Sequence, residues 1–314
     1  MISETTEIKA ASDEAWFACL DQIGEDKGYF QKLGDKHSVL FAEEAPKLLV
    51  SFETVENARS LSEDGLPRGL GLLPEWSHLV LLSDGPTWFR DPAVIGYFDR
   101  LIDEGFLEDF DQVVFMGAGA AGYAAAAFSV AAPGAHVLAI EPQATLDPRL
   151  TGWDTRFEAR RRLDFTSRYG FAPEMLEAAA SATVLFDPMS QSDAMHAALF
   201  SRPNTRLARL PHLMGYIEPA LANMGVLAEL IERIGDGSLC DTKLAKLLRR
   251  RREHLPYLRN LLSARDVDGR ASAVGAICRH ALERFPSERF QSRLDDLEGF
   301  AAPLGETEAL PQHA

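Results

Sequence analysis

A glycine-rich turn carries the clearest chemical signal in this chain. The segment GAGAAG, residues 117–122, follows the apolar run VVFM and precedes an alanine-rich stretch that is expected to be helical. Small residues at such a turn let a pyrophosphate approach the backbone at the N-terminus of a helix. Glu141 ends the next expected strand, where an acidic residue could bind a ribose. This interpretation assigns Gly117, Gly119, Gly122 and Glu141 to a FAD or NAD(P) site.

The same turn also fits a strand–turn–helix that presents a nucleophile, flanked by small residues because the helix packs tightly on the strand. That pattern places the nucleophile at Gly119, which has no side chain. Further along the chain, Asp187 and then His212 each follow an expected strand. The order turn, acid, histidine is that of a nucleophile, an orienting acid and a general base. We therefore predict catalytic roles for Asp187 and His212, although a strand-end turn at Asp187-Pro188 is the structural alternative.

Further polar residues are expected near this turn. Arg90 lies between an expected strand and a helix that begins near Asp91, and it could meet an anionic group or simply pair with an aspartate. Asp193 and His196 lie on an expected helix over residues 193–200, where Asp193 could serve only as a cap. A set of substrate-binding residues follows from this placement: Gly117, Gly119, Ala120, Arg90, Asp193 and His196.

The elements that must position these residues alternate between strands and helices. The expected strands are continuous apolar runs, which is typical of a parallel sheet covered on both faces. They cover residues 38–42, 47–52, 78–82, 113–116, 136–140, 183–186 and 205–210. A long amphipathic helix is expected over 218–234, and residues 56–75 are glycine- and proline-rich and are expected to form a loop.

Beyond residue 237 the pattern contains no strand. Four amphipathic helices are expected over 239–248, 255–264, 271–285 and 290–297. The predicted organisation is therefore an α/β domain over residues 1–235, a helical region over 236–300 and a flexible tail over 301–314.

At this point the sequence resembles the α/β-hydrolase superfamily, and within it bacterial hydrolase-like proteins with a strand–GxSxxGGY–helix turn, some of them associated with surface polysaccharide pathways. The matching residues are VVFMGAGAAGYAAAAF at 113–128, PQATLDP at 142–148, Asp187, Asp193, His196 and His212. The resemblance spans roughly residues 38–234. It implies a doubly wound, mostly parallel sheet of hydrolase-like topology, with Asp187 as orienting acid and His212 as general base. Gly119 stands where the family has serine.

The charge balance excludes several classes of partner. The chain of 314 residues has 32 Lys and Arg against 47 Asp and Glu, a net charge of −15. Such a field does not attract nucleic acid or an anionic membrane. Three well-separated cysteines indicate reduced thiols, and no metal-binding motif is present. The polar N-terminal residues do not resemble a signal peptide, so we expect a cytoplasmic protein.

Three functions remain open on the sequence alone. The first is a hydrolase-like protein without its serine, which acts as a pseudoenzyme or binds an unknown small molecule and needs no cofactor. The second is an oxidoreductase that binds FAD or NAD(P) at the glycine-rich turn. The third is a scaffold that docks a protein partner through its C-terminal helices.

Overall fold

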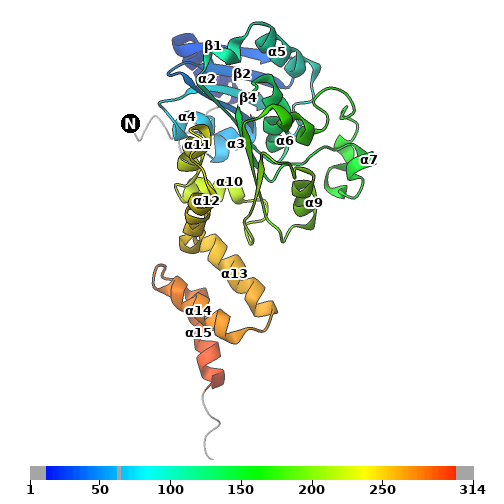
Figure 1. Cartoon of the computed structure of the whole chain (residues 1–314). Helices are drawn as coiled ribbons and strands as arrows, with labels where there is room; N and C mark the ends of the chain where they lie inside the picture. Colours follow the sequence, from blue (N-terminus) through cyan, green and yellow to red (C-terminus); the bar gives the residue numbers. More distant parts are fainter. Residues whose placement is uncertain (1–11, 62–64, 302–314) are drawn as a thin grey trace, which may run out of the picture. The chain divides into compact units, whose positions relative to one another are not determined.

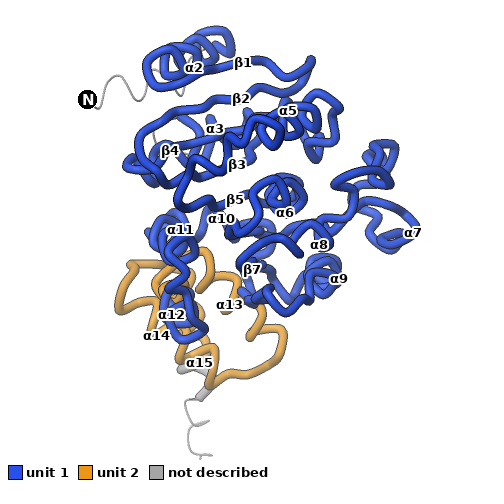
Figure 2. The backbone as a smooth tube through the Cα atoms, turned by 45° about the horizontal axis from the view of Figure 1, so that its top comes forward, with its two compact units in different colours: residues 1–249 blue, residues 250–314 orange. Residues whose placement is uncertain are grey.

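The computed structural model describes residues 12–61 and 65–301, with side chains through residue 297. The chain divides into two compact units, residues 1–249 and 250–314 (Figure 2). The first unit therefore extends beyond the expected boundary at residue 235 and includes one more helix, α12 (Asp241–Leu248). The predicted tail lies outside the described residues from 302 onward.

An eight-stranded sheet forms the centre of the first unit, in the order β1-β2-β4-β3-β5-β6-β7-β8 (Figure 1). Strand β2 runs antiparallel to both of its neighbours, and the other neighbouring pairs are parallel. This order and this one reversed strand are those of the α/β-hydrolase fold, which confirms the predicted fold class. The strands are β1 (Gly28–Leu33), β2 (His37–Ala42), β3 (Lys47–Thr54), β4 (Ser77–Ser83), β5 (Gln112–Ala118), β6 (His136–Ile140), β7 (Ser181–Phe186) and β8 (Thr205–Arg209).

Helices cover both faces of this sheet, which explains the continuous apolar runs in its strands. The helices of the first unit, besides α12, are α2 (Asp13–Lys27), α3 (Val55–Leu61), α4 (Arg68–Leu72), α5 (Pro92–Asp103), α6 (Ala120–Phe128), α7 (Pro148–Thr151), α8 (Ala172–Met175), α9 (Gln191–Leu199), α10 (Ile217–Asn223) and α11 (Leu227–Gly235). Side chains of α5, α6 and α8 share one hydrophobic core, while those of α2 and α3 form a second core with β2 and β4. The alanines of α6 are almost all buried, because small side chains allow this helix to lie close to the sheet.

The observed elements differ from the expected ones in three places. Strand β1 was not predicted. Helices α3 and α4 occupy parts of the segment expected to be a loop. The expected helix over 218–234 is two helices, α10 and α11, separated at Gly225, whose φ of +64° interrupts a right-handed helix.

The second unit is helical, as predicted. It contains α13 (Leu255–Val267), α14 (Ala271–Leu282) and α15 (Glu288–Ala301), and α14 packs against both of the others.

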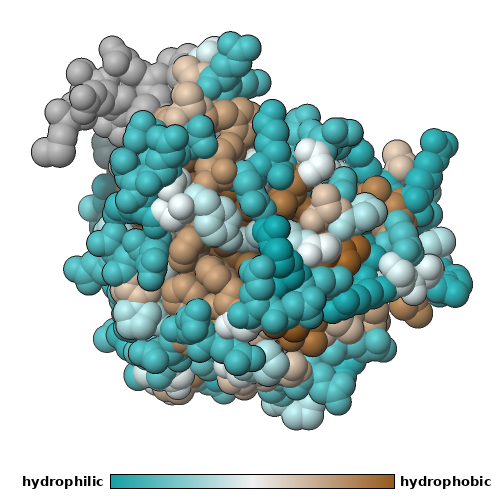
Figure 3. Space-filling model, turned by 90° about the horizontal axis from the view of Figure 1, so that it is seen from above, coloured by the Kyte–Doolittle hydropathy of each residue, from teal (hydrophilic) through white to brown (hydrophobic). Residues whose placement is uncertain are grey.

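Among the helices of the described chain, none is long and apolar enough to cross a membrane. On the face shown in Figure 3, hydrophobic surface lies in patches between hydrophilic side chains.

Candidate functional site

Gly119 lies at the sharp turn between β5 and α6. It follows β5 and caps the N-terminus of α6 with φ 58° and ψ −121°. Its N–H donates to the carbonyl oxygen of Ile140 at 2.8 Å, and its own carbonyl accepts from Tyr123 N–H at 3.0 Å. A Cβ atom placed at Gly119 would meet no atom within 4 Å. The sharp strand-to-helix turn is therefore complete, with open space where a side chain would project.

The flanking glycines are required by packing rather than by a ligand. A Cβ atom at Gly117 would lie 2.3 Å from the carbonyl oxygen of Ala121, which is closer than any real contact. A Cβ atom at Gly122 would lie 3.0 Å from the carbonyl oxygens of both Gly117 and Ile140. The tight approach of α6 to β5 and β6 thus accounts for Gly117 and Gly122, whereas Gly119 is favoured by its positive φ.

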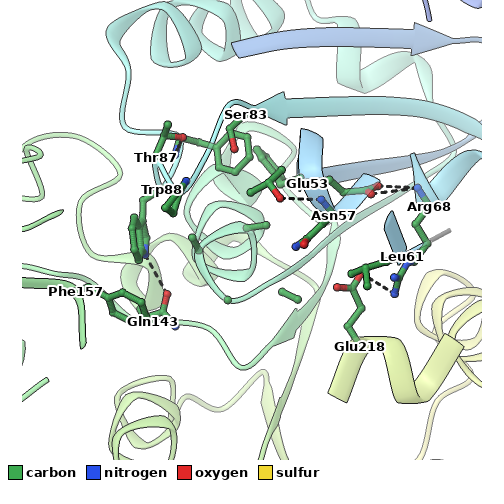
Figure 4. Close-up of a pocket in the computed structure, with 18 residues that line it drawn as sticks. Glu53, Asn57, Leu61, Arg68, Ser83, Thr87, Trp88, Gln143, Phe157 and Glu218 are labelled. Carbon is green, nitrogen blue, oxygen red and sulfur yellow. Dashed lines mark hydrogen bonds and ion pairs between the residues drawn. The ribbon is translucent and has the colours of Figure 1, made fainter. Parts of the chain in front are cut away.

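Two adjoining cavities open at Gly119, and we call them together the elbow cleft. Their volumes are about 280 and 390 Å³, within the range of small-molecule sites when combined. Figure 4 shows the first of them, between the ends of β3 and β4 and the loop after β6. The residues that line both cavities are Asn57, Leu61, Ala118, Gly119, Gln143 and Glu218.

An aromatic wall closes one side of the elbow cleft. Trp88 and Phe89 are buried, and both have positive φ, 52° and 55°. Such values are unusual for bulky residues and are typical of strained functional segments. The Trp88 indole N–H donates to Gln143 Oε1 at 3.1 Å, and its ring meets Phe157 edge-on (Figure 4). The wall is therefore held in place by contacts on both sides of the indole.

Glu141 lies at the cleft with its carboxylate already engaged. Its Oε1 accepts from Gly215 N–H at 2.7 Å and its Oε2 from Ile217 N–H at 3.4 Å. Burial raises the pKa of Glu141 to about 7, and the nearby charges of Asp193 and Asp187 act in the same direction. The carboxylate expected to bind a ribose instead binds the backbone that leads from β8 into α10.

Two glutamates and one arginine, of which Glu53 and Arg68 are buried, form another wall. The Glu53 carboxylate accepts from Arg68 N–H at 3.0 and 3.2 Å, and Arg68 Nη1 lies 3.3 Å from Glu218 Oε1. Burial and the charge of Glu218 raise the pKa of Glu53 to about 7. Burial also raises the pKa of Glu218. All three residues line the elbow cleft.

Asp187 lies where the sequence placed it, at the end of β7, and joins two loops. It is fully buried, with Oδ1 accepting from Met189 N–H at 2.8 Å and Oδ2 from Leu213 N–H at 2.7 Å. His212 is half-buried and has φ +70°. The described residues that line the elbow cleft include neither of them. Their catalytic roles therefore stay predictions. The observed role of Asp187 is to connect the loop after β7 with the loop after β8 through its two hydrogen bonds.

Of the helix pair Asp193 and His196, only Asp193 reaches the cleft. Asp193 accepts from Arg156 Nη1 at 2.7 Å, and both line the cleft. The N-cap of α9 is Ser190, so Asp193 does not serve as the cap. His196 is fully buried: Nδ1 accepts from Ala144 N–H at 3.1 Å, which leaves Nε2–H to donate to Asp154. Burial lowers the pKa of His196, and the neutral ring is part of the interior.

Arg90 is buried and organises a loop instead of facing the cleft. Its guanidinium donates to the carbonyl oxygens of Asp164 at 2.6 Å and Arg168 at 2.8 Å, and to the Ser167 hydroxyl at 3.2 Å. The predicted contact with an anionic ligand is therefore replaced by contacts within the chain. Ala120, in contrast, does line the cleft as expected.

The charged residues Glu53, Arg68 and Glu218 are among the cleft residues that were not singled out from the sequence. Glu53 is the last residue but one of β3, at the same sheet edge as Gly119, so the strand-end rule that selected Asp187 also applies to it. Arg68 and Glu218 lie in segments whose composition gives no functional signal. Within residues 12–61 and 65–301 no group of three His, Cys, Asp or Glu is placed to hold a metal ion.

Comparison with models of protein families and with curated proteins gives no match to this chain. Among solved structures, it is similar to the capsule O-acetyltransferase of Neisseria meningitidis serogroup A, at 11% identity over 66% of this chain and 94% of that one, with a TM-score of 0.41. It is also similar to the carboxylesterase EstE1 from a metagenomic library, at 14% identity over 74% and 99%, with a TM-score of 0.38. A third likeness is to MenH from S. aureus, at 11% identity over 67% and 97%, with a TM-score of 0.31.

Proposed function

We propose that this protein binds a small molecule in the elbow cleft without forming a covalent bond to it. The observation that carries the proposal is the turn at Gly119. Its backbone has the conformation that presents a nucleophile, and open space lies where the side chain would be, yet the residue offers no attacking atom. A nucleophile-dependent acyl transfer cannot begin at this position.

The surroundings of Gly119 support binding. The cleft combines apolar and aromatic walls with a few polar groups at fixed positions, which is the usual make-up of a small-molecule site. Trp88 and Gln143 hold each other, and Arg156 holds Asp193. A ligand would therefore meet side chains that need little reordering, which favours affinity.

The alternative of an FAD- or NAD(P)-dependent oxidoreductase is less well supported. Gly117 and Gly122 are explained by contacts of α6 with β5 and β6, and the Glu141 carboxylate accepts hydrogen bonds from Gly215 and Ile217. A thermal-shift measurement with FAD, NAD and NADP separates the two proposals. A clear rise in the unfolding midpoint with one dinucleotide would favour the oxidoreductase.

The proposal is tested by a ligand-observed NMR screen of small organic fragments. Ala120 lines the cleft in the first turn of α6, so Ala120→Phe is expected to fill the cavity. Ala198 is an exposed residue of α9 outside the cleft, and Ala198→Phe is the matched control. We expect fragments that bind the wild type and the control but not Ala120→Phe. Fragments that bind all three proteins equally would contradict the proposal.

A further inference from the structure

The Arg68 side chain is almost fully enclosed, with 4% of its surface exposed, and it forms part of the cleft wall. Its main chain is fixed, because the Glu53 carboxylate accepts from the Arg68 N–H with both oxygens. In Figure 4 the side chain extends from this point toward Glu218. The guanidinium thus has a defined position beside the cavity.

The donors of this guanidinium are not fully used. Nη1 lies 3.3 Å from Glu218 Oε1, but it makes no hydrogen bond to any residue in the described part of the chain. Buried polar groups are nearly always hydrogen-bonded, and a guanidinium has five N–H donors in a planar fork. Nη1 therefore has an ion-pair contact with Glu218 but no hydrogen bond, and its position beside the cavity allows a ligand to supply the acceptor.

We infer that the elbow cleft takes a small organic carboxylate, whose oxygens accept from Arg68. The inference rests on the proposed function and names its ligand class. A planar carboxylate matches the geometry of a guanidinium fork. The apolar side chains around the same cavity, which include Phe52, Leu61, Phe89 and Phe157, suit an apolar body attached to that carboxylate.

The local charge favours one negative charge on the ligand and no more. The charged groups that face Glu53 are Glu218 of α10 and Arg68 of α4, and Arg68 also faces Glu218. One guanidinium between two carboxyl groups cannot balance a phosphate dianion. A single ligand carboxylate is balanced by Arg68 when both glutamates carry a proton, which the raised pKa of each one favours.

This arrangement couples binding to proton uptake. The added negative charge stabilises the protonated form of Glu53 and Glu218. The carboxylate ligand itself stays ionised above about pH 6. Affinity for the carboxylate is therefore expected to increase as the pH falls from about 8 to about 6, and binding is expected to take up protons from the buffer.

The test compares phenylacetate, phenylacetamide and phenethylamine, which carry a carboxylate, a neutral amide and an ammonium group on a similar body. Dissociation constants are measured by NMR titration of the full chain. We expect phenylacetate to bind at least about tenfold more tightly than the amide, because a guanidinium binds an ionised carboxylate, with two oxygens, more strongly than a neutral amide oxygen. Arg68→Met is expected to abolish this preference.

A second variant keeps the inference falsifiable if Arg68→Met does not fold. Glu218→Gln removes the competing carboxylate, so it is expected to tighten phenylacetate binding and weaken its pH dependence. Weaker binding in Glu218→Gln, a preference that survives Arg68→Met, or tighter binding of phenethylamine would overturn the inference. Equal binding of acid and amide that Ala120→Phe removes would also overturn it, while the proposed small-molecule site would stand. No binding of any compound at millimolar concentration would overturn the carboxylate preference alone, since the fragment screen tests the site independently.

Discussion

The geometry of the turn predicts different losses in the free energy of unfolding for two alanine substitutions, Gly117→Ala and Gly119→Ala. In Gly117→Ala the new methyl group would lie 2.3 Å from the Ala121 carbonyl oxygen and 2.4 Å from its carbon. These are backbone atoms of α6, so the clash can be relieved only by moving the helix. Overpacking of this kind costs about 1–3 kcal/mol and sometimes more, and we expect the upper end of that range or above.

Gly119→Ala is expected to cost less, although its backbone is the more unusual. Its methyl group enters open space, so the cost comes from the positive φ of 58° alone. That cost is about 1–3 kcal/mol for a residue with a Cβ atom held in a sparsely populated backbone region. Gly134 also has positive φ, +86°, with open space at its Cβ, and Gly134→Ala provides a control of the same kind outside the turn.

Urea denaturation followed by tryptophan fluorescence measures these losses in the free energy of unfolding. The four tryptophans all lie between residues 16 and 153, so their fluorescence reports on the first unit. We expect Gly117→Ala to lose more stability than Gly119→Ala, and Gly119→Ala to resemble Gly134→Ala. Equal losses at 117 and 119, or a larger loss at 119, would refute the described geometry of the turn.

Three further predictions concern residues around the turn. Arg90→Met leaves two carbonyl oxygens and a hydroxyl without their donor, so we expect a loss of about 2–4 kcal/mol in urea denaturation, with fragment binding retained; a neutral effect on stability would contradict the anchoring role. Asp187→Asn can satisfy only one of two backbone N–H groups, and we expect a loss of about 1–3 kcal/mol together with faster proteolysis near residue 213. Glu141 has a pKa of about 7 in the folded state and about 4.3 in the unfolded state. Between these values the folded state binds more protons, so the stability of the wild type falls as the pH rises from about 5 to about 7. Glu141→Gln is expected to remove that part of the fall, and identical pH profiles of the two proteins would show that the carboxyl is not perturbed.

The sequence predicted most of the sheet because its strands are long apolar runs with turn residues between them. The helices of the second unit were equally clear, since α13 and α14 begin at the expected residues, Leu255 and Ala271. Strand β1 was not predicted, because GYFQKL is mixed in character and only its last residue is buried. Helix α4 has the sequence RGLGL, which has low helix propensity, and the contact between Glu53 and the Arg68 N–H supports its start.

The candidate site was predictable only in part, and for a physical reason. The turn at Gly119 is a local feature, so the spacing of small residues reveals it. Arg68 and Glu218 are brought to the cleft by the packing of α4 and α10, which no local pattern encodes. Conversely, Arg90 and His196 have residue types suited to ligand binding, but their donors and acceptors are used by Asp164 and Asp154. Whether a polar residue faces a ligand or its own chain depends on tertiary contacts.

The most direct test of a ligand site at Gly119 is an amide TROSY titration of nitrogen-labelled protein with the tightest-binding fragment of the screen. We predict that the largest shift changes fall on the amides of Gly119, Ala120, Gln143 and Glu218, and that Ala120→Phe removes them. Ala198 in α9 is expected to be unaffected. Saturable changes centred on other parts of the first unit, with the Gly119 amide unmoved, would contradict the account.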